Sequence, residues 1–180
     1  MGHAPTIDRV KSSYPGEQAY AGPECLGSGY VAAYDRKAQF DPAEDVPMLL
    51  DAGMNRESIT VDLGAGTGTF AFAAAPHFPE VITVDVSATM VKLLRQRVEE
   101  PGITNIRVVH AGFLSQAHQG ACADLIVLRI ALHQLPDLWK AAVVALGRNP
   151  SMLRPRGYSP ARTDLRRRTC GGRRAHRRRD

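Results

Sequence analysis

Three glycines at alternate positions, Gly64, Gly66 and Gly68, dominate the middle of this 180-residue chain. An apolar, β-branched run over residues 59–61 precedes them and is typical of a buried strand. The alanine-rich residues 70–75 that follow favour a helix. Glycines let the backbone turn tightly and approach a ligand closely, and the helix N-terminus behind them offers free N–H groups and partial positive charge. This order predicts the first half of a nucleotide-binding βα unit.

The glycine spacing separates two kinds of nucleotide site. A dinucleotide fingerprint (Gly-x-Gly-x-x-Gly) beginning at Gly64 needs its third glycine at position 69, which is Thr69. With Asp62 in front, the pattern is instead Asp-x-Gly-x-Gly-x-Gly, which resembles motif I of class I S-adenosylmethionine-dependent methyltransferases. The resemblance implies S-adenosyl-L-methionine as cofactor, held against the loop that includes Ala65, with Asp62 near its cationic amino-acid end. A nicotinamide-dependent oxidoreductase and a ligand-free glycine turn are the alternatives.

Strand-like and helix-like segments alternate through the chain. Strands are predicted over residues 59–61, 81–85, 106–110 and 123–128, and helices over 41–53, 70–76, 87–101 and 138–147. Asp41 and Pro42 are the expected start of the first helix, and Ser87 is the expected cap of the third. Such alternation predicts an α/β fold with a doubly wound, mostly parallel sheet. The resemblance makes it a Rossmann-like methyltransferase fold.

Ligands of doubly wound sheets bind beyond the carboxyl ends of the strands, so the residues at those ends are the candidates. Asp85 ends the second strand about 20 residues after Gly64, where an acid accepts hydrogen bonds from ribose hydroxyls. Val86 is then expected beside adenine. After the third strand the resemblance implies an acid that binds the adenine amino group, but this chain has Gly112 and Phe113. Either the backbone there makes the contact or adenine recognition is weaker.

The segment after the fourth strand carries Arg129 and His133, the polar residues nearest the expected methyl-donor pocket. Residues 131–137 resemble a segment, Ala-Leu-His-His-Leu-Pro-Asp, of small-molecule methyltransferases. His133 is the candidate general base on a hydroxyl or amine acceptor, or else a structural histidine. The histidines lack metal-ligand spacing, so no metal site is predicted. The chain has no Asn/Asp-Pro-Pro-Tyr/Phe sequence after this strand, which argues against amide-nitrogen or adenine methylation of nucleic acid.

The two ends of the chain differ from its middle. Residues 1–29 are rich in Gly, Pro and Ser and are expected to form a loose arm before a methyltransferase domain over 30–155. We expect no membrane span and no signal peptide. Three cysteines without disulfide or metal spacing fit a cytoplasmic setting.

The C-terminal end is strongly basic. Eleven arginines, no lysine and two acids between residues 151 and 180 give this end a net charge of +9, against −4 for the rest. The family resemblance fails after residue 155, and residues 156–180 are expected to be a disordered arginine-rich tail. A frameshift or truncation that removes the last strands is one hypothesis. A tail that binds RNA or DNA through phosphates is the other.

Together these features predict S-adenosylmethionine-dependent methyl transfer to a small-molecule acceptor. The main alternative is an inactive, truncated or frameshifted remnant of such an enzyme. The acceptor, the methylated atom and the oligomeric state are not specified by the sequence.

Overall fold

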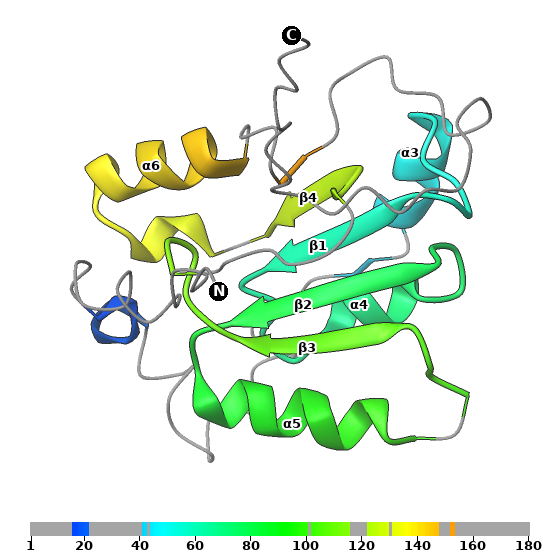
Figure 1. The fold of residues 1–180 in the computed structure, drawn as a ribbon, viewed down its shortest axis with the longest axis horizontal. Coiled ribbons are helices and arrows are strands. Elements are labelled where there is room, and N and C mark those ends of the chain that lie inside the picture. The colour runs from blue at the N-terminus through cyan, green and yellow to red at the C-terminus, as the bar shows by residue number, and fades with distance from the viewer. Residues whose placement is uncertain are drawn as a thin grey trace, which may run out of the picture.

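The computed structural model describes residues 16–21, 41–42, 44–100, 102–115, 122–129, 131–147 and 152–153. Within them, four strands form one parallel sheet in the order β3-β2-β1-β4 (Figure 1). The strands are β1 (Ile59–Leu63), β2 (Glu80–Asp85), β3 (Ile106–His110) and β4 (Leu125–Leu128). The predicted parallel α/β sheet is confirmed. The direction of strand addition reverses beside β1, because β2 and β3 lie on one side of it and β4 on the other.

Side chains of β1 and β2 alternate between the two faces of the sheet, and both faces are buried. Val61 pairs with Ile82 on one face, and Asp62 pairs with Thr83 on the other. All four side chains are at most 3% exposed. Burial on both faces explains why these strands are near-continuous β-branched runs rather than alternating patterns.

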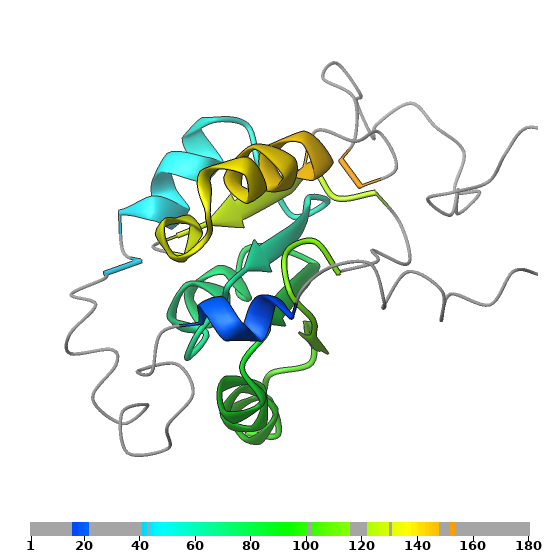
Figure 2. The same ribbon diagram turned by 90° about the vertical axis from the view of Figure 1, so that its left-hand side faces the viewer.

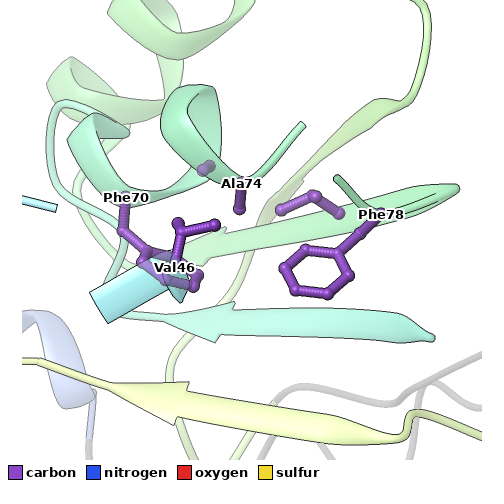
Figure 3. Close-up of a cluster of buried hydrophobic side chains, with 6 residues drawn as sticks. Val46, Phe70, Ala74 and Phe78 are labelled. Carbon is purple, nitrogen blue, oxygen red and sulfur yellow. The ribbon is translucent and has the colours of Figure 1, made fainter. Parts of the chain in front are cut away.

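One face is covered by α3 (Asp45–Asp51), α4 (Thr69–Ala74) and α5 (Ala88–Val98). The core cluster under α3 and α4 contains Val46, Phe70, Ala74 and Phe78, which gather between α4 and the strands (Figure 3). Helix α5 lies beside α4, since the Arg97 guanidinium lies over the Phe72 ring of α4, 4.2 Å from its centroid. The predicted cap of α5 is confirmed, because Ser87 Oγ accepts a hydrogen bond from Met90 N at 3.2 Å.

Helix α3 begins later than predicted. Asp45 N and Val46 N both donate to the Pro42 carbonyl, so Pro42 lies in the turn that leads into the helix. Pro47, which has no N–H to give to a helical ladder, then falls in the first turn of α3, where that donor is not needed. The predicted end at Gly53 is confirmed by its left-handed φ of 96° and the bonds Gly53 N to Leu50 O and Met54 N to Leu49 O, both 3.0 Å.

The opposite face carries α6 (Asp137–Gly147), which follows the short 3-10 helix η3 (Leu132–Gln134). Val143 of α6 packs with Leu114 and Leu135, and Leu128 of β4 packs against this cluster. After α6 the chain returns to the sheet, where Leu153 forms an isolated parallel bridge with Ala123. The fourth strand therefore starts at Leu125 rather than at residue 123.

Two findings bear on the expected setting of the chain. Cys122 is disulfide-bonded, so the expectation of three unpaired cysteines is wrong at this position. Cysteine usage therefore no longer supports the cytoplasmic setting, which stays a prediction. Among the described residues, no helix has both the length and the apolar character needed to cross a membrane.

Candidate functional site

A pocket opens at the carboxyl ends of all four strands. It is lined by Glu17, Tyr20, Ala21, Gly64, Gly66, Val84, Asp85, Val86, Ala111, Gly112, Phe113, Ala131 and Leu135. The pocket includes the reversal of strand order beside β1, where ligands of open α/β sheets bind. Six of the residues predicted from sequence lie in this lining: Gly64, Gly66, Asp85, Val86, Gly112 and Phe113.

The glycine loop has the backbone conformation that its spacing suggested. Gly64, Gly66 and Gly68 have φ values of 76°, 57° and 85°, in the left-handed region that favours glycine. At Gly64 an added Cβ would lie 2.6 Å from the Ala131 Cβ, so a side chain there would also fill the pocket wall. The N–H groups of Gly64 and Ala65 both donate to the Val84 carbonyl, over 2.8 and 3.1 Å, which fixes the loop to the end of β2.

Asp85 is held in place by the backbone around it. Its Oδ2 accepts from Gly66 N and its Oδ1 accepts from Ser87 N, each at 2.8 Å. Burial raises the pKa of this carboxyl, and the surrounding backbone N–H groups and the nearby His110 oppose that shift. A carboxylate has about four acceptor sites, so each oxygen can accept one further hydrogen bond from a ligand hydroxyl.

Asp62 lies deeper than predicted. It is only 3% exposed and is not among the residues that line the pocket. Burial and, second, the nearby Asp85 charge raise the pKa of Asp62 to about 7. A pocket-lining acid with a raised pKa, here Asp85, backed by a second buried acid is typical of a functional site.

A residue that the sequence analysis did not identify lies at the far end of the pocket. Glu17, on the 3-10 helix η2 (Glu17–Tyr20), is 7% exposed and accepts hydrogen bonds from Leu114 N and Ser115 N, over 2.9 and 3.1 Å. We call residues 16–21 the strap, because they cross in front of the strand ends (Figure 2). No periodicity or spacing marks Glu17, so only its position in the fold reveals it.

The other predicted site residues lie outside the lining. Ala65 and Gly68 belong to the glycine loop but are not among the described lining residues. Arg129 is ion-paired with Asp45 of α3, and His133 is exposed on η3, between the lining residues Ala131 and Leu135. Among the described residues, no group of three His, Cys, Asp or Glu side chains is arranged to hold a metal ion.

Comparison with known proteins adds to this geometry. A family model described as "Methyltransferase domain" matches residues 60–157, more than half of the chain. This chain belongs to the methyltransferase-domain family. The resemblance inferred from the glycine loop is thereby confirmed.

One curated relative of this methyltransferase-family chain is the uncharacterized methyltransferase YcgJ of Bacillus subtilis. The two are 30% identical over 109 residues, which cover 60% of this chain and 43% of YcgJ. The chain therefore spans less than half the length of this relative.

Solved structures of methyltransferases share the fold. A SAM-dependent methyltransferase from Aquifex aeolicus has a TM-score of 0.52 at 20% identity, over 64% of this chain and 63% of that one. SAM-bound CalS10 from Micromonospora echinaspora, an amino pentose methyltransferase, has a TM-score of 0.51 at 23% identity, over 64% and 48% of the two chains. At these identities the likeness supports the Rossmann-like methyltransferase fold.

Proposed function

We propose that this chain binds S-adenosyl-L-methionine in the strand-end pocket and transfers its methyl group to a small-molecule acceptor. The observation that carries the proposal is the joint position of the left-handed glycine loop and Asp85 at the reversal of strand order. The Asp85 oxygens keep acceptor sites for the two ribose hydroxyls, and Gly64 and Gly66 bring backbone without a side chain to the pocket lining. The residues present therefore fit the cofactor.

The protein's part in such a reaction is mainly binding and orientation. S-adenosylmethionine, when bound, supplies a methyl group already activated by its sulfonium. Asp85 would fix the nucleoside, and the buried Asp62 behind the loop would respond to the cationic end of the ligand by releasing its proton. Positioning of two reactants and exclusion of water then account for most of the rate enhancement.

His133 is the candidate for the proton that a hydroxyl or amine acceptor gives up. It lies on η3, next to the pocket wall formed by Ala131 and Leu135. A neutral imidazole near the acceptor can take this proton. Replacing His133 with Asn is expected to lower kcat while the affinity for the cofactor stays unchanged.

Calorimetric titration of S-adenosylmethionine and NAD into the full chain tests the proposed cofactor. We expect one site for S-adenosylmethionine and none for NAD. Asp85→Ala should weaken binding by roughly 100-fold or more, because charged hydrogen bonds to the ribose contribute about 1.5–3 kcal/mol each.

Asp124→Ala is the matched control for that variant. Asp124 Oδ2 also accepts a backbone N–H, that of Ile59 at 2.8 Å, but it lies at the other end of β1. This control should keep the wild-type affinity. Absence of S-adenosylmethionine binding by the wild type would mean that the proposed function is wrong and would favour the inactive remnant.

A further inference from the structure

The strap brings an acid to the one end of the pocket that the strands leave without a charged group. Among the described residues that line the pocket, Asp85 and Glu17 are the two that carry a charge. The strap has a second contact at its other end, where the centroid of the Tyr20 ring lies 5.0 Å from the centroid of the Trp139 ring of α6. In Figure 2 the strap passes between α6 and α5, in front of the strand ends.

The Glu17 carboxylate is held rigidly and still has room for one more donor. Its Oε2 accepts from Ser115 N and Ser115 Oγ, both at 3.1 Å, whereas its Oε1 accepts from Leu114 N alone among the residues that the structure describes. Ser115 Oγ in turn accepts from Gly112 N at 2.8 Å, which fixes the hydroxyl as a donor to Glu17. Three of about four acceptor sites are thus used, and the remaining one belongs to Oε1.

Gly112 and Glu17 use the same space. A Cβ added at Gly112 would overlap the Glu17 carboxylate. The carboxylate of Glu17 therefore occupies the position that a side chain of residue 112 would take. The left-handed φ region is not the reason for glycine here, because Gly112 lies outside it.

The position of a bound nucleoside follows from the proposed function, on which this inference rests. With the ribose on Asp85, the base extends along Val86 and the strand-end residues 111–113, all of which line the pocket. Gly112 and the Glu17 carboxylate stand at the end of that path. An acceptor at this position suits a base with an exocyclic amino group, whose N–H needs a partner when it is buried.

We propose that Glu17 is the base-recognition residue of this site: its carboxylate accepts a hydrogen bond from the 6-amino group of adenine. A 6-oxo purine presents an oxygen to the same carboxylate, so the site discriminates against it. Glu17 of the strap thus provides the carboxylate that is missing at positions 112 and 113.

The test compares two ligands that differ only at this group, S-adenosylhomocysteine and S-inosylhomocysteine, by calorimetry on the full chain. We expect the wild type to prefer the adenosine compound by roughly 10- to 100-fold, the range of one charged hydrogen bond. Glu17→Gln should bring the ratio of the two affinities close to one. Glu57→Gln, which removes an exposed carboxylate far from the pocket lining, should leave the ratio unchanged.

A rescue variant separates base recognition from a role in holding the strap. Glu17→Ala should lose the preference, and Glu17→Ala combined with Gly112→Asp should restore it, because the aspartate places a carboxylate in the same space. An unchanged ratio in Glu17→Gln overturns the inference. An equal change in the affinities for the two ligands also overturns it, because the strap would then cover the ligand without distinguishing between the two bases.

Failure of the inference is distinguishable from failure of the proposed function. A wild type that binds S-adenosylhomocysteine while Glu17→Gln keeps its preference contradicts only the role of Glu17. A wild type that binds neither compound contradicts both.

Discussion

Asp62 carries the largest electrostatic cost in the site. Because burial raises its pKa from 3.8 to about 7, the folded chain keeps a proton that the unfolded chain has already released between these two values. The folded state therefore binds more protons in this range, and the free energy of unfolding falls as pH rises through it. The size of this fall is roughly 4 kcal/mol, at about 1.4 kcal/mol per pKa unit.

Asp62→Asn should remove most of that pH dependence. Asparagine is neutral at all pH values, so we expect the variant to be more stable than the wild type by a few kcal/mol at about pH 8 and nearly equal to it below about pH 4. Urea denaturation at the two pH values measures this difference. Asp51→Asn, at an exposed position of α3, is the control. Equal pH slopes for wild type and Asp62→Asn would show that Asp62 is not buried as described.

Gly64 has a left-handed backbone conformation and also lines the pocket, whereas Gly53 has a left-handed conformation but is not among the lining residues. Comparing the same substitution at both glycines separates the effect on backbone conformation from the effect on the pocket. Gly64→Ala should destabilise the fold by about 1–3 kcal/mol, because φ is 76° and the new methyl would meet Ala131 at 2.6 Å. It should also weaken S-adenosylhomocysteine binding at least tenfold or so. Gly53→Ala has a comparable φ of 96° but nothing within 4 Å.

The Gly53 variant should therefore show a cost in thermal stability of about 1–2 kcal/mol and no loss of affinity. Thermal denaturation measures the stability of both variants, and calorimetry measures their affinities for S-adenosylhomocysteine. Equal affinities for the two would mean that Gly64 does not border the ligand.

Ser87, at the start of helix α5, contributes both to the stability of this helix and to the position of Asp85. Ser87 Oγ caps the helix, while Ser87 N donates to Asp85 Oδ1 at 2.8 Å. Ser87→Ala removes the cap and keeps the backbone donor, so it should cost about 1 kcal/mol in the free energy of unfolding with little change in ligand affinity. Gln96→Ala, at an exposed position of the same helix, should change stability by less than about 0.5 kcal/mol. Equal stability of the two variants would argue against the cap.

Local patterns predicted most of the elements and half of the site. The strands were recognisable because both of their faces are buried, so their sequences are β-branched runs, and Asp85 was recognisable by its distance from the glycine loop. The start of α3 was wrong because Asp41 and Pro42 have the chemistry of a helix start and here form the turn before one. Glu17 escaped prediction because its partner Leu114 is 97 residues away, and no local pattern encodes such a contact.

The strand order explains why distant residues form one site. Strands β1, β2, β3 and β4 all end at the same edge of the sheet, where the loops after them and the strap meet (Figure 1). Every described lining residue lies between Glu17 and Leu135.

Deletion of residues 156–180 is expected to leave the affinity for S-adenosylhomocysteine within about twofold of the wild-type value, because it removes none of the residues proposed to bind the ligand. Calorimetry on the shortened chain tests this. A loss of binding without a loss of folding would assign the segment a part in the site. If the same segment binds nucleic acid, the deletion should abolish salt-sensitive RNA binding at the same time.

The central claim is that the strand-end pocket, and no other hollow, holds the nucleoside. A second hollow lies between α3 and α4, lined by Pro42, Val46, Pro47, Leu50, Asp51, Ala73 and His77, and it provides an internal comparison.

Hydrogen–deuterium exchange of the full chain, with and without S-adenosylhomocysteine, distinguishes the two hollows in one measurement. We predict slower exchange at residues 64–68, 85–87 and 111–115, together with the strap, and no change over 45–54. Protection confined to α3, or no protection anywhere, would contradict the account.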